Sequence, residues 1–291
     1  MSPAWRRRLI LLPPALWLGV FFALPFLIVV RIALSDAARA IPPYAPAFEG
    51  WANLGAFLAG LDLDTLRVVL GDGLYTEAYL NSVRLAGLAT LVALVIGFPL
   101  ARAIARATDR WRLLQIKPQT PPSWTTHHVR HDAWIAMLRT DGYLNAVLGA
   151  LGLPTLAILD TETAVVIGLV YAYLPFVVLP IHAALDRADP TIEEAAADLG
   201  CPPWRRLFAI TIPLAMPGIL AGALLMFIPA VGEFIVPDLL GGSETLMIGK
   251  TVWTEFFSNR DWPLAAMIAV LLTLLLAVPI ALWQRSDGGA R

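Results

Sequence analysis

The sequence predicts an all-α polytopic membrane protein, a single transmembrane domain over residues 1–291. Of its 291 residues 58% are hydrophobic and only 15% are charged, and the mean hydropathy is +0.70. A soluble domain of this size needs a more polar surface. Five apolar windows each approach the ~20 residues that a helix needs to cross the hydrocarbon core. These predicted spans lie at about 9–33, 80–106, 163–185, 209–231 and 263–284.

The first span, 9–33, resembles a signal peptide but is predicted to be retained. A basic run, 6–8, precedes it, and the sequence Ala38-Arg39-Ala40 after it resembles a cleavage site. Its apolar run is longer than the ~7 to 15 residues of a signal-peptide core. Basic residues mark the cytoplasmic side of a retained helix, so the N-terminus is expected in the cytoplasm.

The second span, 80–106, returns the chain to the cytoplasm. Basic residues gather at its end and just beyond it, whereas the segment before it is acidic. This asymmetry agrees with an outer loop before the span and a cytoplasmic loop after it. The basic residues are Arg102, Arg106, Arg110 and Arg112.

Residues 113–138, where a third span belongs, are too polar for an ordinary lipid-facing helix. The segment 115–132 contains three prolines, three histidines, Arg130 and Asp132. Each charged side chain at the bilayer centre costs ~2.5 to 3.5 kcal/mol on insertion scales, and each proline removes a backbone donor. Three explanations are open: an error in the sequence, a degenerate copy, or a functional helix that its neighbours shield.

A sixth span is nevertheless required by the polar segment 186–212. Its arginines, Arg187, Arg205 and Arg206, place it on the cytoplasmic side. With six spans this segment and both chain ends lie in the cytoplasm. With five spans the segment would lie outside.

Segment 186–212 is predicted to fold as two short helices joined by a glycine elbow. Asp189 is a candidate N-cap before Pro190, and the acidic residues of the first turn face the positive end of the helix dipole. Gly200 ends this helix, two prolines follow, and a second helix is expected from about Trp204. An ordinary connecting loop with a capped helix is the alternative.

Two carboxylates near the end of the fifth predicted span are candidates for handling a cation. Glu233 and Asp238 lie in a stretch that prolines and a glycine interrupt, and a carboxylate at a membrane edge is costly unless a partner compensates its charge. Tyr171, Tyr173 and Trp253 are candidates for cation–π contacts of ~0.5 to 2 kcal/mol each. The alternative for each aromatic residue is an interfacial belt.

Other motifs carry less weight. Gly249-Lys250-Thr251 is not a phosphate-binding loop, because Glu244 stands where such a loop needs glycine. His127 and His131 are spaced as metal ligands, but no carboxylate lies between them, and we predict no metal site. The single cysteine, Cys201, allows no internal disulfide, and a net charge of −1 gives no support to nucleic-acid binding.

Residues 194–213 resemble the EAA loop of the membrane subunits of bacterial ATP-binding-cassette importers. In that motif E-A-A is followed by three residues, a glycine, nine residues and I-x-L-P, and only Ile212 departs from it. The motif residues here are Glu194, Ala195, Ala196, Gly200, Ile210 and Pro213. Segments 232–242, 247–249 and 260–263 are similar to the spermidine/putrescine branch of these importers.

The resemblance implies a six-span type I permease subunit in the bacterial inner membrane. It implies a second permease, two cytoplasmic ATPase subunits that use ATP and dock on the EAA loops, and a periplasmic or lipid-anchored solute-binding protein. The chain itself would bind no cofactor and catalyse no reaction. The solute would be putrescine, spermidine or a similar small cation that passes Glu233 and Asp238. The six residues of the motif would couple transport to the ATPase.

Three alternatives are open. One is an importer subunit for another small organic solute. The second is a secondary transporter or channel, for which the internal repeats and charged relays are not evident in the sequence. The third is a membrane enzyme, for which the only candidate groups are the three histidines of segment 115–132.

The six-span topology predicts which positions a membrane-impermeant thiol reagent labels in intact cells. In a Cys201→Ala background, a cysteine at Ser243 is expected to react from outside, and one at Ala197 is not. Labelling at 197 would mean that segment 113–138 does not insert.

Overall fold

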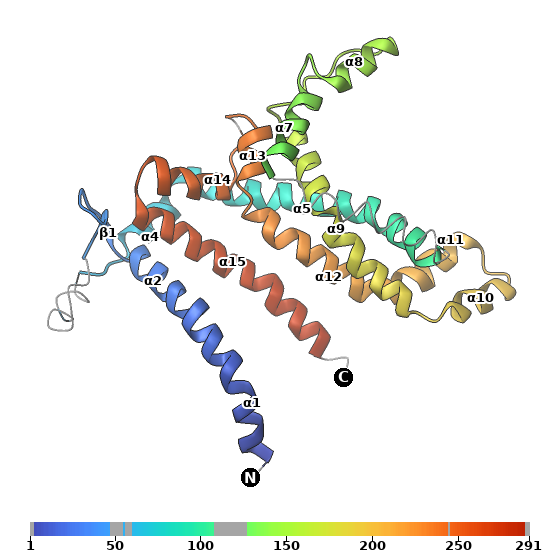
Figure 1. Cartoon of the computed structure of the whole chain (residues 1–291), viewed down its shortest axis with the longest axis horizontal. Helices are drawn as coiled ribbons and strands as arrows, with labels where there is room; N and C mark the ends of the chain where they lie inside the picture. Colours follow the sequence, from blue (N-terminus) through green and yellow to red (C-terminus); the bar gives the residue numbers. More distant parts are fainter. Residues whose placement is uncertain (1–2, 47–54, 56–59, 108–126, 244, 289–291) are drawn as a thin grey trace. The chain divides into compact units, whose positions relative to one another are not determined.

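The computed structural model describes residues 3–46, 55, 60–107, 127–243 and 245–288 (Figure 1). The chain divides into two compact units. The first contains residues 1–78 and 251–291, and the second contains residues 79–250. Each unit is built around long apolar helices.

In the first unit, the N-terminal span packs against the C-terminal span. The N-terminal span consists of α1 (Pro3–Leu18), the π-helical turn η1 (Gly19–Ala23) and α2 (Leu24–Ala33). Helix α2 contacts α15 (Trp262–Gly288), and the two run side by side in Figure 1. Contacts with α15 also come from α4 (Asp64–Gly71) and η6 (Thr254–Ser258).

A short hairpin follows α2. Strands β1 (Asp36–Ala37) and β2 (Tyr44–Ala45) pair antiparallel, with Asp36 opposite Ala45. The ring of Tyr44 lies 6.2 Å from that of Trp262, and the guanidinium of Arg31 lies 5.2 Å from the Tyr44 ring. These contacts attach the hairpin to the ends of α2 and α15.

The second unit is organised by the close approach of α9 (Glu162–Arg187) and α12 (Ile212–Val231). A Cβ atom at Gly218 would lie 2.5 Å from the carbonyl oxygen of Pro180, and one at Gly222 would lie 2.9 Å from that of Val177. In a membrane, where apolar side chains gain little by leaving lipid, such small residues let helix backbones approach and pack. Helix α5 (Gly73–Arg106), most of which belongs to this unit, meets α9 where Gly97 faces Val177.

Shorter helices complete the second unit. They are α7 (His127–Leu138), α8 (Tyr143–Ala150), α10 (Pro190–Asp198), α11 (Pro203–Arg206), η5 (Leu207–Thr211), α13 (Ile235–Leu240) and the first half of α14 (Ile248–Trp253), whose residues from 251 on belong to the first unit. Helix α13 packs on α9, where Gly168 leaves room for Val236 and Leu240. Asn145 joins α8 to the following loop through two hydrogen bonds with the backbone of Leu156.

The five predicted apolar spans are confirmed as long helices. Five helices among the described residues are long and apolar enough to cross a membrane. They cover Ile10–Ala33, Gly73–Arg106, Glu162–Arg187, Pro203–Val231 and Trp262–Ala281. Of the polar third segment, residues 113–126 lie outside the described part of the chain, and 127–138 form α7, which has 12 residues. Alone, α7 is shorter than the ~17 residues of the shortest membrane-crossing helices.

The α9–α12 contact predicts the effect of a larger side chain. Gly218→Val places atoms against the Pro180 carbonyl and the Ala184 methyl, and we expect a loss of about 1 to 3 kcal/mol through overpacking. The midpoint of thermal unfolding of the purified protein in detergent measures this. Gly87→Val is the matched control, because nothing lies within 4 Å of its Cβ position. Equal midpoints for the two variants would contradict the packing argument.

Candidate functional site

The chain between α9 and α12 forms a helical hairpin, which we call the α10–α11 hairpin (residues 189–211). Helix α10 begins as predicted: the side chain of Asp189 accepts hydrogen bonds from the Thr191 amide at 2.9 Å and the Thr191 hydroxyl at 2.8 Å. These bonds, the amide first, lower the pKa of Asp189. Pro190 occupies the first turn, where no N–H is needed.

The hairpin turns at Gly200, which has a φ of +77°. The Gly200 amide donates to the Ala197 carbonyl at 2.9 Å, and the Cys201 amide donates to the Ala196 carbonyl at 3.0 Å. This pair of bonds is the Schellman pattern, which satisfies the last carbonyls of a helix when the next residue is left-handed. The predicted elbow is confirmed, and α11 begins at Pro203, one residue before the expected start.

The hairpin exposes large apolar side chains. Leu199, Trp204 and Phe208 are 88%, 61% and 65% exposed, and Ile192 is also exposed. Of the motif residues, Glu194, Ala195, Gly200 and Pro213 are exposed, while Ala196 and Ile210 are half-buried. Exposed apolar side chains mark a surface that binds another protein or a membrane, and Trp204 and Phe208 lie at the start of the membrane-crossing candidate Pro203–Val231.

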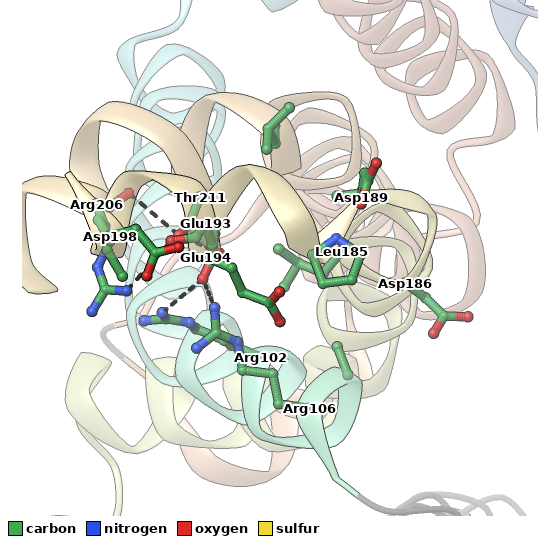
Figure 2. A pocket seen from close by; sticks show the side chains of 15 residues that line it. Arg102, Arg106, Leu185, Asp186, Asp189, Glu193, Glu194, Asp198, Arg206 and Thr211 are labelled. Carbon is green, nitrogen blue, oxygen red and sulfur yellow. Dashed lines mark hydrogen bonds and ion pairs between the residues drawn. The ribbon is translucent and has the colours of Figure 1, made fainter. Parts of the chain in front are cut away.

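Glu193, the residue before the motif, is the carboxylate that faces the protein. One oxygen of Glu193, Oε2, is paired with Arg106 and lies 3.5 Å from Nη2 of Arg102. The other, Oε1, accepts a hydrogen bond of 2.6 Å from the buried hydroxyl of Thr211. Figure 2 shows both guanidiniums turned toward this carboxylate. Arg206 donates to the Glu193 carbonyl at 3.4 Å.

A cavity of about 600 Å³ adjoins this cluster. Its lining combines Arg102, Arg106 and Arg206 with further carboxylates, Glu194 among them (Figure 2). From the sequence, Glu194 was named as a coupling residue and Glu193 was not singled out. The spacing of Arg102 and Arg106 was the sequence signal for a carboxylate that faces them. Two like charges one helical turn apart repel each other, and a counter-ion between them removes this repulsion.

The second candidate site is Glu233, in the turn between α12 and α13. Its Oε2 accepts a 2.5 Å hydrogen bond from the hydroxyl of Tyr173 on α9. Its Oε1 accepts from the amides of Phe234 at 3.2 Å and Ile235 at 3.0 Å. The carboxylate is therefore held at the start of α13, and the structure brings together Tyr173 and Glu233, two of the residues predicted to contact the cation.

The other predicted path residues have different surroundings. Asp238 is exposed and lies 3.5 Å from Nζ of Lys250, which also donates to the Gly242 carbonyl. Tyr171 is exposed and meets Trp134 edge-on at 5.0 Å between ring centroids. Trp253 belongs to the first unit, where its ring lies 4.1 Å from that of Phe257.

The remaining chemical candidates give no metal site within the described residues. No group of three or more His, Cys, Asp or Glu side chains there is arranged to hold a metal ion. The side chains of His127, His128 and His131 lie outside the described part. Cys201 is a half-buried free thiol.

The structure thus combines helices that are long and apolar enough to cross a membrane with a hairpin that exposes apolar side chains. Residues 120–285 match the family model described as "Binding-protein-dependent transport system inner membrane component", and the chain belongs to this family. It is thus the permease subunit of an ATP-binding-cassette importer, a transporter component and not an enzyme.

Relatives agree with this assignment. The chain is 34% identical over 275 residues to the "Spermidine/putrescine transport system permease protein PotB" of Haemophilus influenzae, covering 93% of this chain and 90% of that one. It is 39% identical over 218 residues to the protein of the same name from Escherichia coli K12, covering 74% and 79%. A chain in the crystal structure of a bacterial alginate ABC transporter has the same fold, with a TM-score of 0.68, 17% identity and coverage of 96% and 92%.

The left-handed backbone at Gly200 predicts a specific pattern of variants. Gly200→Val costs about 1 to 2 kcal/mol of backbone strain, although nothing crowds its Cβ position. We expect Val to distort the elbow and lower the solute taken up per ATP hydrolysed by the complete importer. Gly200→Asn, which tolerates this conformation, is expected to stay near wild type. Unchanged uptake in the Val variant would refute the assignment.

Proposed function

We propose that this subunit forms, with a second permease, the translocation path for putrescine, spermidine or a similar small cation. The observation that carries the proposal is its 34% identity, over 93% of its length, with a relative named for spermidine and putrescine transport. An outer solute-binding protein would deliver the solute. Two cytoplasmic ATPase subunits would drive its passage.

Glu233 is the proposed contact for an amine of the solute. Asp238 is already paired with Lys250, whereas the hydrogen bonds to Glu233 come from a hydroxyl and two amides, which are neutral. Among the ion pairs of the described residues, none neutralises Glu233. Its negative charge is therefore available to an ammonium group, and the neutral donors hold the carboxylate in place.

The α10–α11 hairpin is the proposed docking element for an ATPase subunit. Glu194 and the exposed apolar residues Leu199, Trp204 and Phe208 would enter the groove of the partner. The rigid elbow at Gly200 suits a hairpin that the ATPase subunit displaces as a rigid body. This assignment places the hairpin and both chain ends in the cytoplasm, and it requires that segment 113–138 completes a six-span path.

Uptake into proteoliposomes tests the proposal. The importer is purified with its own partner subunits, and entry of labelled putrescine and spermidine is measured with and without ATP. We expect ATP-dependent uptake that needs the solute-binding protein, and none by this subunit alone. Uptake by the subunit alone would support the secondary transporter or channel. Lack of uptake of either polyamine, with uptake of another solute, would correct the substrate.

The charge of Glu233 predicts the effect of its amide. Glu233→Gln keeps the shape and removes the charge, with its single oxygen accepting from the two backbone amides and its NH2 group donating to the hydroxyl of Tyr173. A charge-assisted hydrogen bond contributes ~1.5 to 3 kcal/mol, so we expect polyamine uptake at limiting concentration to fall at least about tenfold. Asp64→Asn, an exposed carboxylate paired with Arg67 on α4, is the control. Equal uptake by the Gln variant and wild type would remove Glu233 from the path.

A further inference from the structure

We propose that Glu193 transmits the movement of the α10–α11 hairpin to α5, so that α5, α9 and α12 move together. The inference rests on the proposed function, in which an ATPase displaces the hairpin. It assigns a positioning role to a residue outside the EAA motif. The two arginines that end α5 share this role.

Connectivity shows why such a link is needed. The hairpin is continuous in the chain with α9 and α12, so a displacement reaches these two helices directly. Helix α5 ends at Arg106, far from the hairpin in sequence. The ion pairs that join α5 to the hairpin, among the described residues, all involve Glu193.

Electrostatics makes this link costly to break. Arg102 and Arg106 lie one turn apart on α5, and like charges at this spacing repel. The carboxylate between them is only 16% exposed, and the side chain of Arg102 is 27% exposed. Separating the groups would leave partly buried charges without a counter-ion, which costs more than breaking an exposed pair.

The second oxygen of Glu193 connects to the other end of the hairpin. Thr211, which donates to it, is the last residue of the π-helical turn η5, directly before α12. Its side chain is buried, and its hydroxyl lies closer to Glu193, at 2.6 Å, than to the Arg206 carbonyl, at 3.3 Å. The two oxygens of one carboxylate thus join the end of α5, the start of α10 and the start of α12.

Helix capping alone does not account for this arrangement. An acidic residue in the first turn of α10 is favoured by the helix dipole whether or not it faces the protein. The neighbouring Glu194 is exposed, and among the described residues it makes no hydrogen bond or ion pair. Glu193 is the one that is turned inward and held by three side chains.

The test compares coupling in the complete importer in proteoliposomes. Glu193→Gln keeps an acceptor for Thr211 but removes the charge that faces the arginines. Allosteric coupling energies correspond to about 5- to 150-fold effects, and we expect the ratio of polyamine uptake to ATP hydrolysis to fall about tenfold. Asp141→Asn, which breaks the exposed pair with Arg139, is the matched control and is expected to leave the ratio unchanged.

A charge exchange separates transmission from a merely structural role. The double variant Glu193→Arg with Arg106→Glu restores an opposite-charge pair between α10 and α5. We expect it to recover part of the lost ratio, whereas Glu193→Arg alone does not. Recovery supports the proposal. A ratio no better than that of Glu193→Arg overturns it.

A further variant keeps the test decisive if Glu193→Gln does not assemble. The double variant Arg102→Gln with Arg106→Gln removes both ion pairs to α5 and leaves Glu193 with its hydrogen bond from Thr211. An unchanged ratio in this double variant would overturn the inference. If the wild-type importer shows no ATP-driven uptake, the proposed function fails instead, and the two failures are therefore distinguishable.

Discussion

The close packing of α9 against α12 is the contact on which both candidate sites depend. Gly218 and Gly222 remove the side chains that would otherwise hold the two backbones apart. Beyond one end of the pair lies the α10–α11 hairpin, which is anchored at both of its own ends. Toward the other end, Tyr173 of α9 reaches Glu233 after α12. The same helix pair therefore positions the proposed docking element and the proposed solute contact.

The structure uses the carboxylates of Glu193 and Glu233 in different ways. Glu193 lies between two guanidiniums, where its charge is compensated by other parts of the same chain. Glu233 is held by a tyrosine hydroxyl and two backbone amides, which orient a carboxylate without neutralising it. The first arrangement suits a fixed joint between helices. The second suits a site that awaits a cation, because the remaining charge is stabilised by a cationic ligand.

Local sequence signals predict much of the hairpin. An Asp-Pro pair starts a helix and a glycine ends it through bonds between near neighbours, so the cap at Asp189 and the elbow at Gly200 were both foreseen. The inward carboxylate was not, because Glu193 and Glu194 are adjacent in the same helical turn. Nothing within that turn distinguishes them. The same limit applies to Asp238, whose pairing with Lys250 depends on how α13 and α14 meet.

The sequence by itself determined the class of the molecule and the places of its five apolar helices. Hydropathy over some 20 residues decides whether a helix is stable in lipid, and that property does not depend on the fold. Only the tertiary structure decided which face of each helix meets another. The fold pairs Glu193 with the arginines of α5 and brings the hydroxyl of Tyr173 to Glu233. Such contacts depend on helix rotation and on glycines that permit close approach, and these are set by packing between segments distant in the chain.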